Sequence, residues 1–231
     1  MKYRNKNIKI TCDGGAATGK STGAKLIAKK YNLAFLSSGL LYRYASYLLI
    51  KHKPNKKIFF LRKKFKNLDY NKIKKINLQK PIISKNAAII AKLKSVRSIL
   101  KNYQINFIKK NDGCVLEGRD ASTKILPNSD LKFFFICTLN IAAKRRFKEL
   151  KKNQKKITFK EVKQALYERN MLDTRRKISP LQRHPDAVVV DTGKLDVKSM
   201  VAKMSKLVDQ IIKSKYEKRT IKRFIASSKR V

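Results

Sequence analysis

The 231-residue sequence predicts a single α/β domain, in which a parallel β-sheet is flanked by helices. Short apolar runs of strand length alternate along the chain with longer segments whose apolar residues have helical spacing. The strand-like runs are almost continuously apolar, as expected when helices cover both faces of a parallel sheet. A glycine-rich loop joins the first of these runs to the first helical segment, and no Pro/Gly-rich linker or repeat divides the chain.

The expected elements follow in order along the chain. Strands are predicted at 7–13, 33–36, 113–117, 131–137 and 187–191. Helices are predicted at 19–31, 40–50, 86–110, 140–150, 159–169 and 197–213, and residues 51–80 also carry apolar side chains at helical spacing. Because strands and helices alternate, right-handed crossovers should join the parallel strands.

The chain is strongly basic, with 58 Lys and Arg against 15 Asp and Glu and a net charge of +43. This excludes an acidic scaffold and favours polyanionic partners such as nucleotides, nucleic acid or anionic membrane surfaces. The 44 lysines accompany many Asn and Ile residues, a mixture that an AT-rich genome tends to impose. We interpret most of the charge in that way, and selected affinity for nucleic acid stays open as the alternative.

Three cysteines, Cys12, Cys114 and Cys137, lie in or beside apolar runs. An odd, sparse set of this kind is typical of small buried side chains in a reducing compartment, not of a disulfide framework. The apolar stretch near the start is too short for a signal peptide, and no apolar run reaches a membrane-spanning length of roughly 18 to 20 residues. We therefore expect a soluble, cytoplasmic protein with no membrane partner.

The glycine-rich loop fits the pattern G-x-x-x-x-G-K-[ST] of a phosphate-binding loop, which predicts a P-loop NTPase-type sheet. Between a buried strand and a helix, such a loop points backbone N–H groups at a phosphate chain. Lys20 should reach the outer phosphates, and a hydroxyl of Ser21 or Thr22 should bind Mg²⁺. The nucleotide-binding residues are expected to be Gly14, Gly15, Ala16, Ala17, Thr18, Gly19, Lys20, Ser21 and Thr22.

A second motif, Leu116-Glu117-Gly118-Arg119-Asp120, follows the third predicted strand, where open α/β sheets place their ligands. Glu117 could orient magnesium through a water molecule. The alternative interpretation is a surface turn with a local Arg–Asp pair.

A third motif contains Arg169, Asp173 and Arg176, which fall on one face if the helix that begins near Phe159 continues through them. Two guanidinium groups beside a carboxylate can clamp a transferring phosphoryl group. The alternative is a solvated, charged helix.

A fourth segment combines a hydroxyl at a strand end, a ring and a guanidinium in Ser38, Tyr42 and Arg43. These groups could contact a nucleoside monophosphate. By themselves they fit a core tyrosine and a surface arginine equally well.

Together and in this order, the four motifs resemble those of the bacterial-type cytidylate kinase family, from about residue 8 to residue 212. The resemblance implies a nucleoside monophosphate kinase that transfers the γ-phosphoryl group of ATP to CMP and dCMP, with ATP and Mg²⁺ as cofactors. It also adds Arg97, which matches the arginine of the family's Asn-Ala-Ala…Val-Arg helix. The implied catalytic residues are Lys20, Arg119, Arg169, Asp173 and Arg176. The implied CMP-binding residues are Ser38, Tyr42, Arg43, Arg97, Arg119, Asp120, Arg169 and Asp173.

The resemblance also implies the organisation of one kinase domain spanning 1–231. Its core would be 1–43, 86–146 and 179–212, its monophosphate-binding insert 44–85, its helical lid 147–178 and its basic tail 213–231. A monomer is implied as well. Lid closure would exclude water from two polyanions that repel one another, so catalysis should depend on positioning and charge neutralisation.

The sequence departs from the family's pattern at several places. Ser37 stands where an acid usually precedes the substrate-site serine, and Glu117 replaces a shorter acid. In the lid pattern, Asn170, Met171 and Leu172 replace Asp-Asp-Arg. The serine that contacts cytosine in the family matches Ala88. This last departure, with the short Lys-rich insert, motivates the hypothesis of a relaxed base preference.

Two other functions stay open from the sequence. Residues 51–80 hold twelve Lys and Arg against one acid, and residues 213–231 hold eight against one, so a polyanion- or RNA-binding protein on a kinase fold is the alternative outside enzymes. RNA affinity as a secondary property of a kinase is a weaker form of the same idea. Within enzymes, the alternative is a P-loop kinase for UMP, AMP or another small acceptor.

Overall fold

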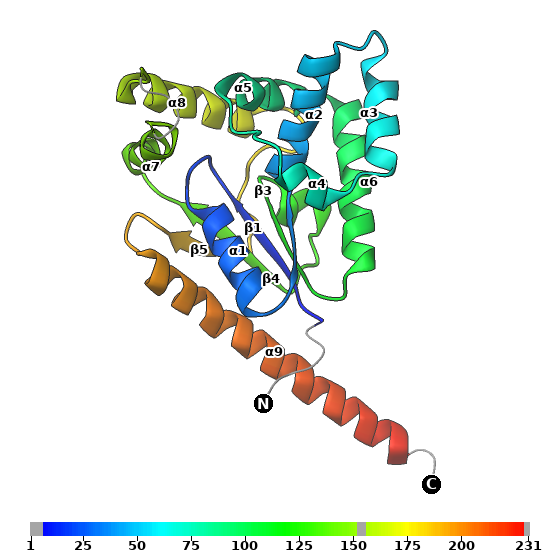
Figure 1. Cartoon of the computed structure of the whole chain (residues 1–231). Helices are drawn as coiled ribbons and strands as arrows, with labels where there is room; N and C mark the ends of the chain where they lie inside the picture. Colours follow the sequence, from blue (N-terminus) through cyan, green and yellow to red (C-terminus); the bar gives the residue numbers. More distant parts are fainter. Residues whose placement is uncertain (1–6, 152–155, 229–231) are drawn as a thin grey trace.

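The sheet of the computed structural model has five parallel strands in the order β2-β3-β1-β4-β5 (Figure 1). The structure describes residues 7–151 and 156–228, with side chains described as far as residue 217. The strands are β1 (Lys9–Gly14), β2 (Ala34–Ser37), β3 (Cys114–Gly118), β4 (Leu131–Ile136) and β5 (Val188–Asp191). Each predicted strand is confirmed to within two residues at either end.

The helices surround this sheet. They are α1 (Lys20–Lys30), α2 (Ser38–His52), α3 (Lys57–Lys66), α4 (Tyr70–Lys74), α5 (Pro81–Ile90), α6 (Lys94–Lys110), α7 (Leu139–Lys151), α8 (Phe159–Arg175) and α9 (Val197–Ser228), with a π-helical turn at Ala121–Ile125. Helices α8 and α9 extend beyond the predicted 159–169 and 197–213. The continuous helix predicted over 86–110 is wrong.

The chain breaks between α5 and α6 although no Gly or Pro marks the place. Ala91 ends α5, and Leu93, in an extended conformation, precedes α6. The carbonyl of Ala91, which helix continuation would have used, accepts a hydrogen bond from Arg97 Nη1 at 3.2 Å. A side chain of the next helix therefore satisfies a backbone group that the break exposes.

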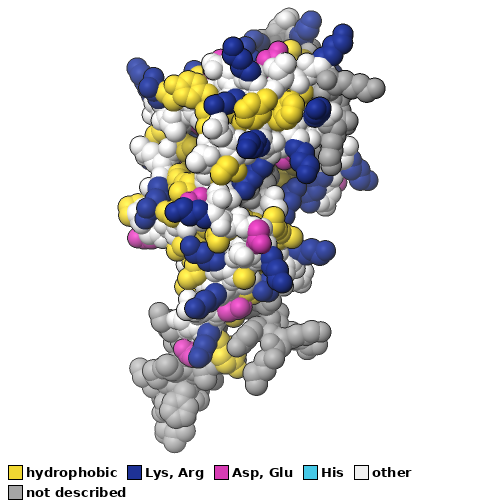
Figure 2. Space-filling view, turned by 90° about the vertical axis from the view of Figure 1, so that its left-hand side faces the viewer, with side chains coloured by type: hydrophobic (Ala, Val, Ile, Leu, Met, Phe, Trp, Pro, Cys, Tyr) yellow, Lys and Arg dark blue, Asp and Glu magenta, His cyan; other side chains and the backbone are white. Residues whose placement is uncertain are grey.

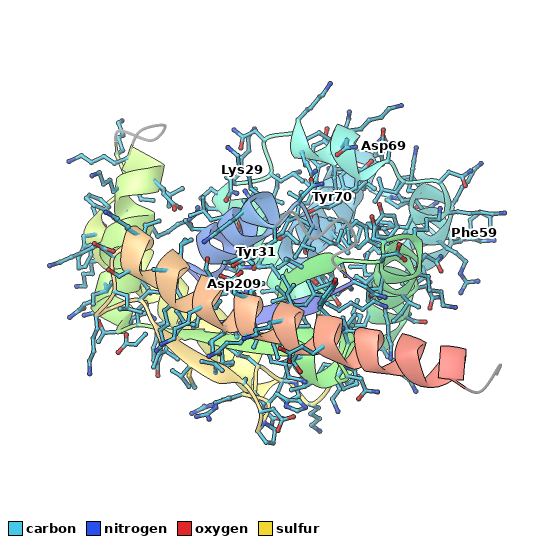
Figure 3. The ribbon with its side chains drawn as sticks, turned by 90° about the horizontal axis from the view of Figure 1, so that it is seen from below. Lys29, Tyr31, Phe59, Asp69, Tyr70 and Asp209 are labelled. Carbon is cyan, nitrogen blue, oxygen red and sulfur yellow. The ribbon has the colours of Figure 1, made fainter. Side chains whose placement is uncertain are left out.

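One face of the sheet is covered by α1 and α9, which lie side by side (Figures 1 and 3). Their buried side chains, such as Ile27 and Met204, pack on alternate strand residues including Phe133 and Phe135. Figure 3 shows Tyr31, just after α1, directed toward Asp209 on α9. The Tyr31 hydroxyl donates to Asp209 Oδ1 at 2.8 Å, so a polar contact supplements this apolar layer.

Helix α6 and the π-helical turn cover the other face, where Ile108, Leu116 and Ile125 are buried together. Helices α2 to α6 also enclose a second apolar cluster beyond β2, with Leu41, Leu61 and other side chains of its interior fully buried. The Lys-rich segment 51–80 is therefore a packed helical unit. In Figure 3 Phe59 points away from this unit, and its side chain is 68% exposed.

Helices α7 and α8 form a separate layer above the carboxyl ends of the strands (Figure 1). A capping box begins α8, with Thr158 Oγ1 accepting from the Glu161 N–H and Glu161 accepting from the Thr158 N–H. Leu166 and Val162 of α8 pack on Ala143 of α7 and on Ala16. Residues 152–155 of the expected lid lie outside the described residues.

Figure 2 shows Lys and Arg side chains spread over this face of the molecule without a single dense patch. No helix in the described ranges has the length and apolar character needed to cross a membrane.

Candidate active site

The phosphate-binding loop joins β1 to α1 and lies at the carboxyl edge of the sheet. Gly14 has φ +152°, and a Cβ there would lie 2.4 Å from the carbonyl oxygen of Phe135. Gly19 has φ +82°, in the left-handed region that favours glycine, directly before the first turn of α1. The loop can therefore pass closely over β4 and then present the N–H groups at the start of α1 to an anion.

Lys20 is the first residue of α1 and is 5% exposed. Its Nζ donates to the carbonyl oxygen of Gly15 at 2.9 Å and lies 3.5 Å from Glu117 Oε1. Burial, together with the positive charge of Arg119, lowers the pKa of Lys20 to about 7, although Glu117 opposes the shift. The structure thus folds the lysine back onto its own loop.

Glu117, the penultimate residue of β3, lies beside Ser37, because the register of the parallel strands pairs these two residues. Ser37 Oγ donates to Glu117 Oε2 at 2.5 Å. Burial tends to raise the pKa of Glu117, but Lys20, the Ser37 hydrogen bond and Arg119 together lower it below its ordinary value. An ionised carboxylate therefore faces the loop lysine at the strand ends.

Two ion pairs connect α8 and the residue after it to the turn that follows β3. Arg119 Nε donates to Asp173 Oδ2 at 2.8 Å, and Arg176 Nη2 lies 3.7 Å from Asp120 Oδ1. Arg176 Nη1 also lies 3.4 Å from Asp173 Oδ1. Arg97 of α6 donates to the other oxygen of Asp120. Residues from three distant segments thus form one buried network.

Arg43 and Arg169 differ from these paired arginines. Neither forms an ion pair with another residue of the described ranges, and the Nε atom of each is buried without a hydrogen-bond partner there. Burial, then the nearby arginines, lower the pKa of Arg169 to about 9 and that of Arg43, beside Arg146, to about 10. Such cations cost free energy to bury, so the site is prepared for an anion that the protein does not itself supply.

A cavity of about 620 Å³ opens on one side of these cations. Loop residues Ala16 to Thr22 line it, together with Glu117, Arg119 and Arg169. Arg145 of α7 borders it and donates to the hydroxyl and carbonyl oxygens of Thr192 at 2.8 and 2.6 Å. The volume lies in the usual range for ligand sites.

A second cavity on the other side has a volume of only about 40 Å³, too small for a nucleotide. Tyr42 and Ala88 border it, and the Arg97 guanidinium lies over the Tyr42 ring at 5.8 Å. Ser38 also borders it and donates to Gln104 Oε1 at 2.7 Å. The two cavities share Arg119 and Arg169, so these two arginines stand between a larger and a smaller binding space.

The structure brings the residues predicted from sequence together around these two cavities. The larger one is lined by Lys20, Ser21, Thr22, Arg43, Glu117, Arg119 and Arg169, and the smaller one by Ser38, Tyr42, Arg119, Asp120, Arg169, Asp173 and Arg176. Three other predicted site residues, Gly14, Gly15 and Arg97, line neither of these two cavities. One correction concerns Arg176, which was expected on the helix but follows its end in an extended conformation. It reaches Asp120 from there.

Other functional candidates were missed from the sequence. Asp13, buried at the end of β1, accepts hydrogen bonds from the turn after β3. Asn170 contacts the phosphate-binding loop, and Gln104 holds Ser38. For Asp13 a signal existed, because an acid in an apolar strand just before a glycine loop is unusual. Asn170 lies within the third motif but was noted there only as a departure from the family's pattern, and nothing local distinguishes Gln104.

The fold and the site define a P-loop kinase, in which a phosphate-binding loop faces a buried cluster of arginines at the carboxyl edge of a parallel sheet. The family model for cytidylate kinase matches residues 10–210. The chain belongs to the cytidylate kinase family.

Individual relatives agree with this assignment. A cytidylate kinase from Clostridium tetani is 34% identical over 220 residues, which cover 90% of this chain and 97% of that protein. One from Mesomycoplasma hyopneumoniae is 35% identical over 215 residues, which cover 88% and 94%. The crystal structure of an uncharacterized protein from Eubacterium ventriosum has a similar fold, with a TM-score of 0.51, 16% identity and coverage of 89% and 99%.

Proposed function

We propose that this site transfers the γ-phosphoryl group of ATP to the phosphate of CMP or dCMP, giving ADP and CDP or dCDP. The observation that carries the proposal is a pair of arginines without an ion-pair partner among the described residues: Arg43 lines the larger cavity, and Arg169 lines both cavities. Two nucleotides whose phosphates meet there would supply the missing negative charge. Family membership supports cytidylate as the acceptor.

In this proposal the larger cavity holds ATP. Residues 14–22 bind the triphosphate, mainly through backbone N–H groups and the partial positive charge at the start of α1. Lys20 leaves its contact with the Gly15 carbonyl and turns to the outer phosphates. The binding of a polyanion favours the ammonium form, so the depressed pKa of Lys20 rises when ATP binds.

The smaller cavity and its walls hold the acceptor. Arg43, Arg119 and Arg169 contact the phosphate of CMP, since planar guanidinium groups bind phosphate oxygens in pairs. Ser38, Tyr42, Arg97, Asp120 and Asp173 border or support the space for the sugar and base. Because about 40 Å³ cannot contain a nucleotide, the walls formed by α5 and α8 separate when CMP enters.

The transfer itself needs no covalent enzyme intermediate. The acceptor phosphate attacks the γ-phosphorus in line, while ADP leaves on the opposite side. Lys20, Arg119, Arg169 and Arg176 spread positive charge around the phosphoryl group as it moves. Asp173 orients Arg119 and Arg176 through its two carboxylate oxygens. Exclusion of water by α8 prevents wasteful hydrolysis.

The hydroxyls of Ser21 and Thr22 and the ionised carboxylate of Glu117 line the ATP cavity. These are hard oxygen donors, and they fit a magnesium ion that is held mainly by water and phosphate oxygens. Such an ion would neutralise charge on the β- and γ-phosphates. Ser21, Thr22 and Glu117 are the residues that would hold this ion in the proposal.

The domain organisation is also part of the proposal. The core carries the loop and the sheet, 44–85 is the monophosphate-binding insert, 147–178 is the lid and 213–231 is a basic tail. The separate apolar clusters of the insert and of α7 with α8 support independent movement of these parts relative to the core.

We also propose that the enzyme is a cytoplasmic monomer. Free Cys12, Cys114 and Cys137 support a reducing compartment.

Secondary RNA binding can be tested separately from kinase activity, because the basic tail lies beyond residue 210, where the match to the family model ends. Charge-neutralising substitutions in 213–231 should weaken salt-dependent RNA binding and leave kinase activity intact if that property exists.

The decisive experiment is a coupled assay of ADP release with Mg·ATP and CMP, dCMP, UMP, AMP or shikimate as acceptor. Turnover with CMP and dCMP supports the proposal. Turnover with shikimate but no nucleotide would replace it, and ATP binding without transfer to any acceptor would favour the polyanion-binding alternative.

A further inference from the structure

A side chain of α8 accepts a hydrogen bond from a backbone N–H group of the phosphate-binding loop. The backbone N–H of Ala16 donates to Asn170 Oδ1 at 3.1 Å. The same oxygen lies 3.3 Å from the position that a Cβ on Gly15 would take. The amide of Asn170 therefore lies directly on the loop, at a point where the loop has no side chain to separate them.

The residues around this contact connect it to the arginine that lines both cavities. Ala16 is also buried against Leu166 and Val162 of α8, so apolar packing holds the same residue from which the hydrogen bond is donated. Asn170 follows Arg169, the unneutralised cation between the two cavities. A shift of Asn170 away from the loop would carry Arg169 with it.

Helix α8 is thus attached to the core at two separate points. On the acceptor side, Asp173 binds Arg119, and Arg176, just past the helix end, lies by Asp120. On the donor side, the attachment consists of the Asn170 hydrogen bond and the packing around Ala16. The acceptor-side contacts involve charged groups that also line the CMP space, whereas the donor-side hydrogen bond is made by a neutral amide.

We propose that Asn170 is a positioning residue that latches α8 onto the phosphate-binding loop and so fixes Arg169 over the transferring phosphoryl group. This proposal rests on the proposed function of the site. The latch needs only a side-chain oxygen that accepts the Ala16 N–H. When α8 moves away, water takes that N–H, and when the latch closes, Asn170 displaces the water from beside the phosphates.

Substitution at Asn170 tests this directly. Asn170→Ala removes the acceptor, and Asn170→Leu removes it while keeping similar volume. Asn170→Asp keeps an oxygen that accepts from the N–H. Gln164→Ala is the matched control, because Gln164 lies exposed on the same helix and pairs only with Glu168 in the described hydrogen bonds.

Three quantities should be measured for each variant: kcat, the KM values for ATP and CMP, and the ratio of ATP hydrolysed to CMP phosphorylated. Loss of one positioning hydrogen bond should lower kcat about tenfold in the Ala and Leu variants and raise the hydrolysis ratio about fivefold or more. The KM for CMP should change less than about twofold, since the acceptor-side contacts remain. The Asp variant should keep kcat within about threefold, and the Gln164 variant should match the wild type.

A merely structural role would lower thermal stability without changing the partition of ATP between water and CMP. Wild-type kcat and partition in Asn170→Ala would overturn the latch, and so would an Asp variant as impaired as the Ala variant. If the wild-type protein transferred no phosphoryl group to CMP, the proposed function would fail instead, which is a separate result.

Discussion

Ser122 donates two hydrogen bonds to the same carboxylate oxygen of Asp13, one from its backbone N–H at 2.7 Å and one from its Oγ at 2.6 Å. The other oxygen accepts the N–H of Ala121 at 2.9 Å. Asp13 immediately precedes the phosphate-binding loop, and Ser122 is the second residue of the π-helical turn that follows Arg119 and Asp120. One buried side chain therefore fixes the start of the phosphate-binding loop relative to the turn after β3.

Titration of the Asp13 carboxylate should make the stability of the fold decrease as the pH rises. Burial raises the pKa of Asp13 to about 6 against the hydrogen bonds of Ser122 and Ala121. An acid with a raised folded pKa loses its proton first in the unfolded chain, so its contribution is greatest below about pH 4 and falls as the pH rises to 6. The whole protein also contains carboxylates with lowered pKa values, including Glu117 and Asp173, which act in the opposite direction.

The difference between wild type and Asp13→Asn isolates the effect. The unfolding free energy of wild type minus that of the variant should decrease by about 2 to 3 kcal/mol between pH 4 and pH 7. Chemical denaturation at several pH values measures it. A difference that stays flat over this range would contradict the raised pKa.

The lowered pKa of Lys20 predicts that the protein takes up a proton when ATP binds. In the free enzyme its pKa is lowered to about 7, so at pH 8 most molecules carry a neutral amine there. Because the triphosphate stabilises the ammonium form, ATP binding at pH 8 should take up most of one proton, and ATP affinity should fall as the pH rises above 7. Calorimetry in buffers of different ionisation enthalpy measures the uptake, and Lys20→Met should abolish it. Binding without uptake at pH 8 would refute the prediction.

Replacement of Arg169 should have opposite effects on the stability and the activity of the protein. Its folded pKa is lowered, so the charged form is penalised in the protein at neutral pH, where it is charged in both states. Replacing it with Met should raise the unfolding free energy without nucleotide by about 1 to 4 kcal/mol. The same change should reduce kcat about a hundredfold. Arg175→Met, on the exposed side of the same helix, is the control and should change neither. A less stable Arg169→Met protein would argue against an unneutralised cation.

The alanine at position 88 predicts weak discrimination between CMP and nucleoside monophosphates with other bases. It is buried and borders the smaller cavity with Ala87 and Ala91, so this wall offers methyl groups in place of a side-chain hydroxyl. We expect UMP to react with a kcat/KM less than about a thousandfold below that of CMP, and Ala88→Ser to widen the gap about tenfold. Equal values for CMP and dCMP with UMP and AMP at least about a thousandfold worse in the wild type would reject the hypothesis.

The sequence by itself determined the strands, the phosphate-binding loop and the charged residues that follow the strand ends at the two cavities. These follow from local patterns: strand-length apolar runs, a glycine loop before a helix, and charged residues just after buried strands. The positions of Glu117 and Arg119 could be inferred in this way, because the carboxyl ends of parallel strands share one edge of the sheet.

Only the tertiary structure decided which side chains meet. Asp13 and Ser122 are 109 residues apart, and Ala16 and Asn170 are 154 apart. At the break after α5, the carbonyl of Ala91 likewise accepts a hydrogen bond from the side chain of Arg97. Local sequence patterns encode burial and backbone preference, whereas these contacts require the packed positions of several elements at once. The residue types that gather at the strand ends were therefore predictable from the chain, but the contacts that hold α8 and the walls of the two cavities in place were not.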